Sequence, residues 1–190
     1  MWRFLTIAIL LLGCSGGCTD TPKDLEPVEE SPIYWNECGF EVGDHACDFT
    51  LTDQNGVEWN LYDHYGEIIV LDFSTEWCGY CHLAAEETQS VQNEKEELVD
   101  FSYVTIIVED MAGNSPPTQQ ALQRWSEHYF ITAPVLAGSR DMLESGGGDW
   151  PISSWPTFYI LNDDLLITQI IHGYSAQSLE DAINSTINPS

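Results

Sequence analysis

The sequence predicts an α/β fold in which a central mixed β-sheet is flanked by helices, with a β-hairpin added on its N-terminal side. Two apolar runs, residues 68–73 and 101–108, are short and rich in β-branched residues, which is typical of strands buried on both faces. Segments with helical spacing of apolar residues follow both runs. Such an alternation of strands and helices favours a layered α/β domain.

The chain begins with a segment typical of a secretory signal. Arg3 precedes an apolar run, residues 4–12, that is too short to span a bilayer. This run ends in LLGC at residues 11–14, which resembles a bacterial lipoprotein cleavage box. We therefore expect residues 1–18 to form a lipoprotein-type signal and anchor, lipidated at Cys14.

The composition of the next segment, residues 19–37, is typical of a flexible tether. Residues 19–32 carry three prolines and five acids and almost no large apolar side chain, so residues 19–37 are expected to form a flexible acidic tether before a folded domain at 38–190. Cys18 is the alternative lipidation site, and Ser15 would by analogy permit sorting to the outer membrane.

The charge of the chain limits its partners. Thirty-one acidic residues against five basic ones give a formal net charge of −26. This excess of negative charge argues against nucleic acid or anionic lipid as an electrostatic partner. A solvated acidic surface is the simplest interpretation.

Cys38 and Cys47 flank a stretch of turn-forming residues and predict a structural disulfide, as expected outside the cytoplasm. Closing a loop of this length contributes about 2.7 kcal/mol in a chain-entropy model. The alternative is a zinc or copper site that uses the two thiols and His45.

The remaining elements follow from periodicity and turn signals. In chain order they are a β-hairpin around Asp53-Gln54-Asn55-Gly56, a helix from Gly79 to about Leu98, a helix over 119–129, a short strand at 134–137, an irregular loop at 139–154, a hairpin over 157–171 and a helix from Ser175 to about 187. This order predicts a mixed sheet with helices on both faces.

Two cysteines lie just beyond the first buried strand, at the carboxyl edge where α/β proteins place reactive groups. If a helix starts near Gly79, Cys78 lies at its N-terminus and Cys81 about one turn in, so that both sulfurs share a face. The positive helix end is expected to stabilise a thiolate at Cys78. One thiol can then attack a disulfide and the other can resolve the mixed disulfide, without any cofactor.

These residues resemble a known family. Residues 70–81, VLDFSTEWCGYC, are similar to the active-site strand and turn of thioredoxin, and Trp155-Pro156-Thr157 before an apolar run resembles its cis-proline loop. The match covers about residues 49–187, and its leader, N-terminal hairpin and longer central segment are most similar to the extracytoplasmic TlpA/ResA-like branch. The resemblance implies a thioredoxin fold and thiol:disulfide exchange with protein cysteines.

Asp72 is a candidate for handling the proton. On its strand it shares a face with residues 68 and 70, so its carboxylate is expected in apolar surroundings behind the cysteines. Burial without a partner raises the pKa of a carboxyl group and prepares it for proton exchange. The resemblance implies that Asp72 assists deprotonation of Cys81, and the alternative is a satisfied acid at a strand end.

The proline loop is the expected substrate platform. By resemblance, a cis Pro156 places the backbone of Trp155 beside Cys78, where it can pair with an extended substrate segment. The candidate substrate-binding residues are Trp77, Gly79, Tyr80, Trp155 and Pro156, with Trp150 at the rim of the groove. Ordinary aromatic packing is the alternative.

Three further readings stay open. Residues 78–82, CGYCH, satisfy the c-type haem attachment pattern, and Cys78, Cys81 and His82 could serve a copper carrier. Thr75-Glu76-Trp77-Cys78 matches the T-x-x-C part of a peroxiredoxin site, although Leu71 stands where that site has a proline.

The sequence as a whole thus predicts a thiol:disulfide oxidoreductase on the periplasmic side of a bacterial membrane, held by lipid, with the outer membrane favoured. Its expected partners are protein thiols or disulfides and an upstream redox partner, with no nucleic acid, metal or cofactor. Reductase, oxidase and isomerase activities all remain compatible with this assignment.

Overall fold

The computed structural model describes residues 33–189 of the 190-residue chain. The expected signal with Cys14, the alternative Cys18 and the expected tether up to residue 32 lie outside the described residues. Among the helices that are described, none combines the length and apolar character needed to cross a membrane.

The core of the domain is a five-stranded mixed sheet in the order β5-β4-β3-β6-β7. Its strands are β3 (Ile68–Ser74), β4 (Phe101–Ile107), β5 (Val135–Ala137), β6 (Thr157–Leu161) and β7 (Ile167–His172). Central β3 pairs in parallel with β4 and antiparallel with β6. All seven residues of β3 are buried, as expected for a strand covered on both faces.

A separate two-stranded sheet precedes the main one. Strands β1 (Thr50–Thr52) and β2 (Glu58–Asn60) pair antiparallel around the predicted turn. In that turn the Asp53 side chain accepts hydrogen bonds from the backbone N–H groups of Asn55 and Val57, both at 2.8 Å. The predicted N-terminal hairpin and mixed sheet are therefore confirmed.

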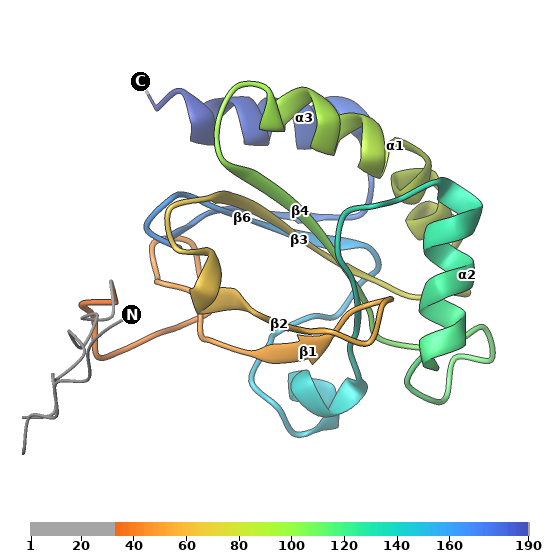
Figure 1. The fold of residues 1–190 in the computed structure, drawn as a ribbon. Helices are drawn as coiled ribbons and strands as arrows, with labels where there is room; N and C mark the ends of the chain where they lie inside the picture. The colour runs from red at the N-terminus through yellow and green to blue at the C-terminus, as the bar shows by residue number, and fades with distance from the viewer. Residues whose placement is uncertain (1–32, 190) are drawn as a thin grey trace, which may run out of the picture. The chain divides into compact units, whose positions relative to one another are not determined.

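All three α-helices lie on the same face of the sheet. They are α1 (Gly79–Glu96), α2 (Gln119–Tyr129) and α3 (Ala176–Ile187). Val70 of β3 packs with residues of α1 and α3, and Ile107 of β4, on the same face, packs with Leu122 of α2. The expectation of helices on both faces is wrong, because the two right-handed crossovers β3-α1-β4 and β4-α2-β5 progress in the same direction. Figure 1 shows α1 and α3 together along this face.

The opposite face is covered by the β1-β2 hairpin and by the loop predicted over 139–154. That loop holds two short 3₁₀ turns, Arg140–Met142 and Glu144–Gly146. Trp150 is 4% exposed and packs against Phe73 and Tyr159, so its expected place at a substrate groove is wrong. The glycines of the loop permit this close passage, since a Cβ on Gly146 would lie 1.9 Å from the carbonyl oxygen of Arg140.

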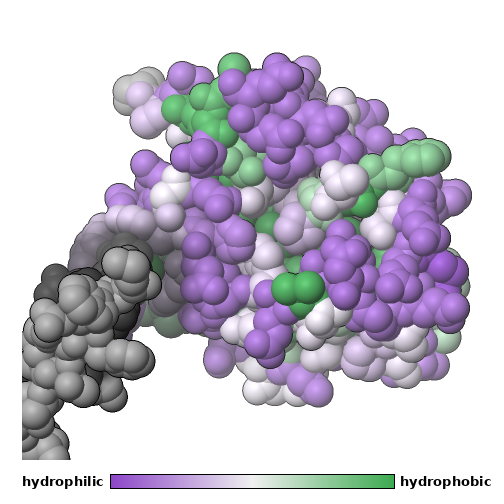
Figure 2. All heavy atoms as spheres, in the orientation of Figure 1, coloured by the Kyte–Doolittle hydropathy of each residue, from purple (hydrophilic) through white to green (hydrophobic). Residues whose placement is uncertain are grey.

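Figure 2 shows a mainly hydrophilic surface on the face in view, with separate hydrophobic patches. This agrees with the excess of acidic side chains in the chain. The exposed large apolar side chains in the described part include Trp77 and Tyr80, which flank the two cysteines of the helix start.

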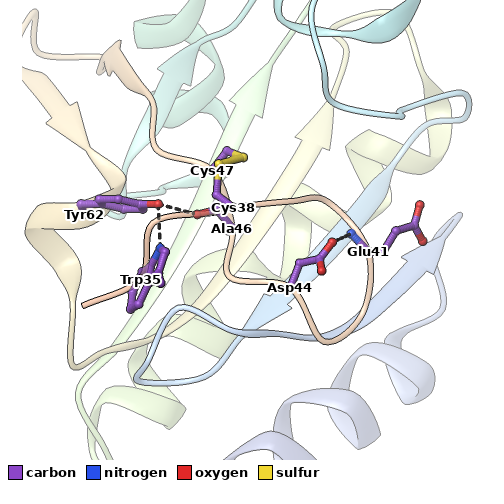
Figure 3. The surroundings of a disulfide bond; sticks show 7 residues. All are labelled: Trp35, Cys38, Glu41, Asp44, Ala46, Cys47 and Tyr62. Carbon is purple, nitrogen blue, oxygen red and sulfur yellow. Dashed lines mark hydrogen bonds between the residues drawn. A yellow bond between two sulfur atoms is a disulfide. The ribbon is translucent and has the colours of Figure 1, made fainter. Parts of the chain in front are cut away.

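Cys38 and Cys47 form a disulfide, which confirms the structural alternative and overturns the metal alternative (Figure 3). His45 instead stacks on Trp35, with 3.9 Å between the ring centroids. The indole of Trp35 donates a hydrogen bond to the Tyr62 hydroxyl over 3.1 Å, so packing of the domain begins before Cys38.

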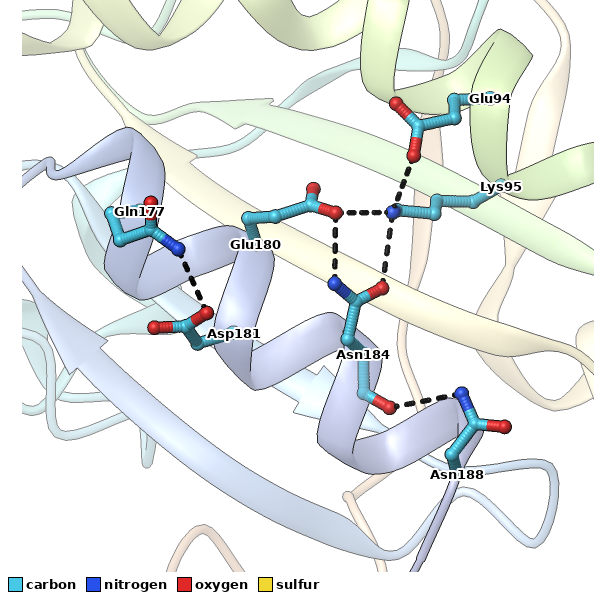
Figure 4. A network of polar contacts seen from close by, with 7 residues as sticks. All are labelled: Glu94, Lys95, Gln177, Glu180, Asp181, Asn184 and Asn188. Atoms are coloured by element: carbon cyan, nitrogen blue, oxygen red, sulfur yellow. Dashed lines mark hydrogen bonds and ion pairs between the residues drawn. The ribbon is translucent and has the colours of Figure 1, made fainter.

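A buried lysine joins α1 to α3 at the far end of the helical face (Figure 4). The Lys95 side chain is 1% exposed, and its ammonium donates to Glu180 of α3 at 2.5 Å and to Glu94 at 2.9 Å. A third bond, of 3.1 Å, reaches the amide oxygen of Asn184. Lys95 thereby fixes the spacing of α1 and α3 near their ends.

Candidate active site

The two remaining described cysteines lie where β3 passes into α1, and both are free thiols. Cys78 is the residue immediately before α1, and its carbonyl oxygen accepts backbone hydrogen bonds from Cys81 (3.0 Å) and His82 (3.2 Å). Cys78 is 8% exposed, whereas Cys81 is fully buried. Of the two thiol residues, Cys78 therefore keeps the larger accessible fraction.

The Cys78 thiol points at the proline loop. Its Sγ donates to the carbonyl oxygen of Trp155 over 3.6 Å, and the Trp155-Pro156 peptide bond is cis. The carbonyl oxygen of Pro156 accepts a 2.8 Å hydrogen bond from the backbone of Gly173, which follows β7. Residues far apart in the chain thus form one wall beside the reactive sulfur.

Asp72 lies in the interior behind the cysteines. Its side chain is 1% exposed and accepts hydrogen bonds from the Ser74 hydroxyl at 2.6 Å and from the Tyr103 hydroxyl at 3.4 Å. Burial raises the pKa of Asp72 to about 7, against the lowering effect of these two hydrogen bonds. A carboxyl group with this pKa can both accept and release a proton near neutrality.

The pKa of the buried Cys81 thiol depends on this carboxylate. Burial raises the pKa of Cys81, and the nearby negative charge of Asp72 raises it further. The Ser74 hydroxyl lowers the pKa of Cys81 and donates a hydrogen bond to Asp72, so it acts on both titrating groups. Cys81 consequently needs a base before it can act as a nucleophile, and Asp72 is the base within reach.

The sequence does not reveal the role of Ser74 or Tyr103. Ser74 ends β3, and Tyr103 lies beside Val70 in the register of β3 with β4. Only the pairing of the two strands places the Tyr103 hydroxyl near Asp72, and this register is not encoded in any local motif.

The remaining candidate residues lie at the surface of the site. Trp77 is 44% exposed and Tyr80 is 62% exposed. Trp155 is half-buried and packs against apolar residues on both faces of the sheet. Gly79 is the first residue of α1, and a Cβ there would meet open space. Trp77, Gly79 and Tyr80 adjoin the two cysteines in the chain, and the Trp155 carbonyl oxygen contacts the Cys78 sulfur.

An acidic residue at the end of β4 fixes the Trp77 segment, which the sequence also does not reveal. Glu109 is 1% exposed, accepts a 2.9 Å hydrogen bond from the indole N–H of Trp77 and forms an ion pair with Arg140. Glu76 accepts a 3.0 Å hydrogen bond from the backbone N–H of Met111. The loop after β4 is thereby joined to the turn that carries Cys78.

His82 is already engaged within the protein. Its Nε2 lies 2.8 Å from the carbonyl oxygen of Glu76, and its Nδ1 contacts the Tyr129 hydroxyl. Both ring nitrogens are occupied, which argues against His82 as a haem or copper ligand beside the cysteines. Within residues 33–189 no group of three or more His, Cys, Asp or Glu side chains is arranged to hold a metal ion.

Comparison with known proteins gives a consistent result. The AhpC/TSA family model matches residues 42–170. The thioredoxin-like protein YneN of Bacillus subtilis is 26% identical over 134 residues, covering 70% of this chain and 73% of YneN. The thiol-disulfide oxidoreductase ResA of Geobacillus thermodenitrificans is 27% identical over 141 residues, covering 74% of this chain and 75% of ResA.

Solved structures agree on the fold. The crystal structure of a putative thiol:disulfide interchange protein DsbE from Chlorobium tepidum superposes with a TM-score of 0.63 at 18% identity, covering 79% of this chain and all of the other. With a free Cys-x-x-Cys pair at the start of α1 and a proline loop beside it, the chain belongs to the AhpC/TSA family and is a thioredoxin-fold oxidoreductase of the ResA-like kind.

Proposed function

We propose that this protein exchanges its Cys78-Cys81 dithiol or disulfide with cysteines of other proteins outside the cytoplasm. The observation that carries the proposal is the position of the Cys78 sulfur, 3.6 Å from the Trp155 carbonyl oxygen, with Cys81 buried directly behind it. An extended substrate strand beside Trp155 would present its own sulfur to Cys78.

The proposed reaction has two steps. In the reducing direction, the Cys78 thiolate attacks a substrate disulfide, forms a mixed disulfide and releases one substrate thiolate. Cys81 then loses its proton towards Asp72, and its thiolate attacks the Cys78 sulfur of the mixed disulfide. This closes the Cys78-Cys81 bond and releases the second substrate thiolate, and the oxidising direction is the exact reverse.

The test is insulin reduction by the purified domain with dithiothreitol as electron donor. We expect turnover in the wild type without added metal, and background turnover in Cys78→Ser. Turnover undiminished in Cys78→Ser would overturn the proposal. Titrations with copper and with hydrogen peroxide in parallel address the other readings: tight copper binding without exchange would support a carrier, and rapid oxidation by peroxide with no exchange would support a peroxidase.

The potential of the cysteine pair decides the direction of electron flow. Equilibration with glutathione buffers gives the midpoint potential. A value near ~−270 mV assigns a reductant, and one near ~−120 mV assigns an oxidant.

The proposed location rests on the leader of the sequence, with lipidation at Cys14 as its anchor. Mass spectrometry of the N-terminus after expression in a bacterial host tests it. A diacylglyceryl group is expected on the wild type and on Cys18→Ala, but not on Cys14→Ala. Lipidation retained in Cys14→Ala and lost in Cys18→Ala would move the anchor to Cys18.

A further inference from the structure

The proton that Asp72 takes up has to leave the protein interior. Asp72 is 1% exposed, and a bound substrate polypeptide would cover the surface around Cys78 during the exchange. Because each resolution step moves one proton from Cys81, a repeated cycle needs an exit that the substrate does not close.

Hydroxyl groups connect the buried thiol to the carboxylate and continue beyond it. The Ser74 hydroxyl bonds to one Asp72 oxygen at 2.6 Å and contacts the Cys81 sulfur. The Tyr103 hydroxyl donates to the other Asp72 oxygen over 3.4 Å. The carboxylate therefore has a different hydroxyl group on each of its two oxygens, one towards the thiol and one away from it.

A cavity of about 250 Å³ lies between α1 and α3, and Tyr103 is one of the residues that line it. Its lining also includes Ala84, Thr88 and Tyr174. Burial raises the pKa of Tyr103, against a lowering effect of the Thr88 side chain. A cavity of this size with polar walls admits several water molecules. Its lining contains neither Cys78 nor the proline loop, so a substrate at the active site leaves it open.

Lys95 of α1 forms an ion pair with Glu180 of α3 at one end of this cavity. Glu94 and Glu180, which both line the cavity, are the two carboxylates that the Lys95 ammonium joins across α1 and α3 (Figure 4). Through Glu180 this contact joins the two helices at that end of the cavity.

We propose that the Tyr103 hydroxyl relays the proton between Asp72 and water in the cavity between α1 and α3, so that proton transfer continues while a substrate covers Cys78. This inference rests on the proposed exchange function. In the resolution step the Cys81 proton passes through the Ser74 hydroxyl to Asp72, and the Cys81 thiolate attacks the mixed disulfide. Rotation of the protonated carboxyl group then presents its O–H to the Tyr103 oxygen, and the Tyr103 hydroxyl turns from Asp72 towards the cavity. Tyr103 accepts this proton and releases its own proton to water, and the reverse reaction follows the same route inwards. Tyr103 exchanges the proton with Asp72 and acts on the two sulfur atoms only through Asp72, so it is a positioning residue for the exchange.

Repeated-turnover kinetics of the full-length protein, with disulfide-bonded peptide and dithiothreitol in excess, test the relay, because every cycle after the first needs Asp72 to have released its proton. Acid quenching and mass spectrometry of the first turnover separate the formation of the mixed disulfide from its resolution. In Tyr103→Phe we expect the repeated-turnover rate to fall by about tenfold at its high-pH plateau, with both steps of the first turnover unchanged. Tyr159→Phe is the matched control, because Tyr159 is an equally buried tyrosine that faces the opposite side of the sheet, and it should leave repeated turnover and both steps unchanged.

The pH profile separates a relay from a structural role. The titrating groups that face Asp72 are Cys81 from α1, Tyr103 from β4 and Tyr174 before α3. If Tyr103 only adjusts the titration of Asp72, Tyr103→Phe moves the midpoint of the pH profile of repeated turnover and leaves its plateau intact. That outcome, or an equal loss in Tyr159→Phe, overturns the relay.

A measurement on the wild type does not depend on the folding of a variant. Repeated-turnover rates at the high-pH plateau in mixtures of H₂O and D₂O should fall along a curve as the deuterium fraction rises, because proton exit through Tyr103 moves more than one proton. A straight line would overturn the relay. Failure of Cys78→Ser to abolish exchange would instead remove the proposed function itself, so the two failures are distinguishable.

Discussion

Asp72 stands at a position where an acid is unfavourable for stability, and this has a measurable consequence. Its folded-state pKa of about 7 lies well above the ordinary value of 3.8. The folded protein therefore keeps a proton on Asp72 between about pH 4 and 7, where the unfolded chain has lost it. Stability falls as the pH rises through this window and reaches its full deficit above pH 7.

We expect Asp72→Asn to stabilise the protein by about 4 kcal/mol at pH 8, because the amide has no charge to bury. The gain should shrink towards pH 4, because the folded protein then keeps the Asp72 proton and buries no charge. Urea unfolding of the oxidised protein at the two pH values measures it. Asp181→Asn, at an exposed position on α3, is the control and should change the stability little at either pH.

The same substitution should harm catalysis. Asp72→Asn removes the base beside Cys81, so we expect resolution of the mixed disulfide to slow by roughly 10²-fold while its formation is unchanged. In the wild type the resolution rate should rise with pH through about 7, as Asp72 loses its proton. Stopped-flow measurement of both steps across pH provides the check, and equal profiles for the two proteins would remove Asp72 from the reaction.

Sequence reasoning identified the residues of this centre that share one local segment. Asp72, Cys78 and Cys81 lie within a single strand and helix start; periodicity places Asp72 in the interior, and the resemblance to thioredoxin implies its role towards Cys81. Ser74 and Tyr103 were not identified. Tyr103 and Asp72 are 31 positions apart in the chain and come together only through the register of β3 with β4. A serine at a strand end carries no signal of its own.

At the scale of elements, the turn between β3 and α1 is fixed by the loop that follows β4. Glu109 is a buried carboxylate, and its partners are Trp77 from this turn and Arg140 from the loop after β5. Removal of one partner of a buried charge is costly, because the remaining charge has lost its compensation.

We expect Arg140→Ala to destabilise the protein by on the order of 2 kcal/mol, with about half of the guanidinium side chain exposed in the wild type. Alkylation of Cys78 by iodoacetamide should also accelerate, since Trp77 would be held less firmly beside it. Arg124→Ala is the matched control, because Arg124 is an exposed arginine on α2. Comparable changes in both variants would mean that Glu109 does not hold the turn.

The sequence predicted where each helix begins and ends, but not which face of the sheet it covers. Each helix was expected close to its observed bounds, whereas its face depends on the strand order, which periodicity does not give. The loop over 139–154 shows the same limit. Its glycines indicated irregular backbone, but not that the loop carries Trp150 into the core opposite the helices.

At the scale of the whole molecule, the segment that precedes the β1-β2 hairpin is hydrogen-bonded to the turn between β6 and β7. The loop closed by Cys38 and Cys47 pairs with the β6-β7 turn through backbone bonds such as Ala46 N–H to Leu165 O at 3.0 Å. The disulfide joins two residues of this segment, and we expect it to have no part in the chemistry of Cys78 and Cys81.

Replacement of Cys38 and Cys47 together by alanine should therefore cost about 2–3 kcal/mol of unfolding free energy and leave insulin reduction at its wild-type rate. Urea unfolding without reductant and the insulin assay measure the two effects. Cys78→Ala combined with Cys81→Ala is the complementary control, expected to abolish reduction. Loss of exchange in the first pair at full folding would assign that disulfide a redox role.

The burial of Lys95 also determines which reagents can capture partners of the folded domain. Lys95 is the single lysine between residues 33 and 189, and its amine is enclosed by two carboxylates and an amide. Crosslinkers that target primary amines should consequently leave this region unmodified in its native state. Carbodiimide coupling through the abundant surface carboxylates, or trapping through Cys78, is the productive way to isolate a bound polypeptide.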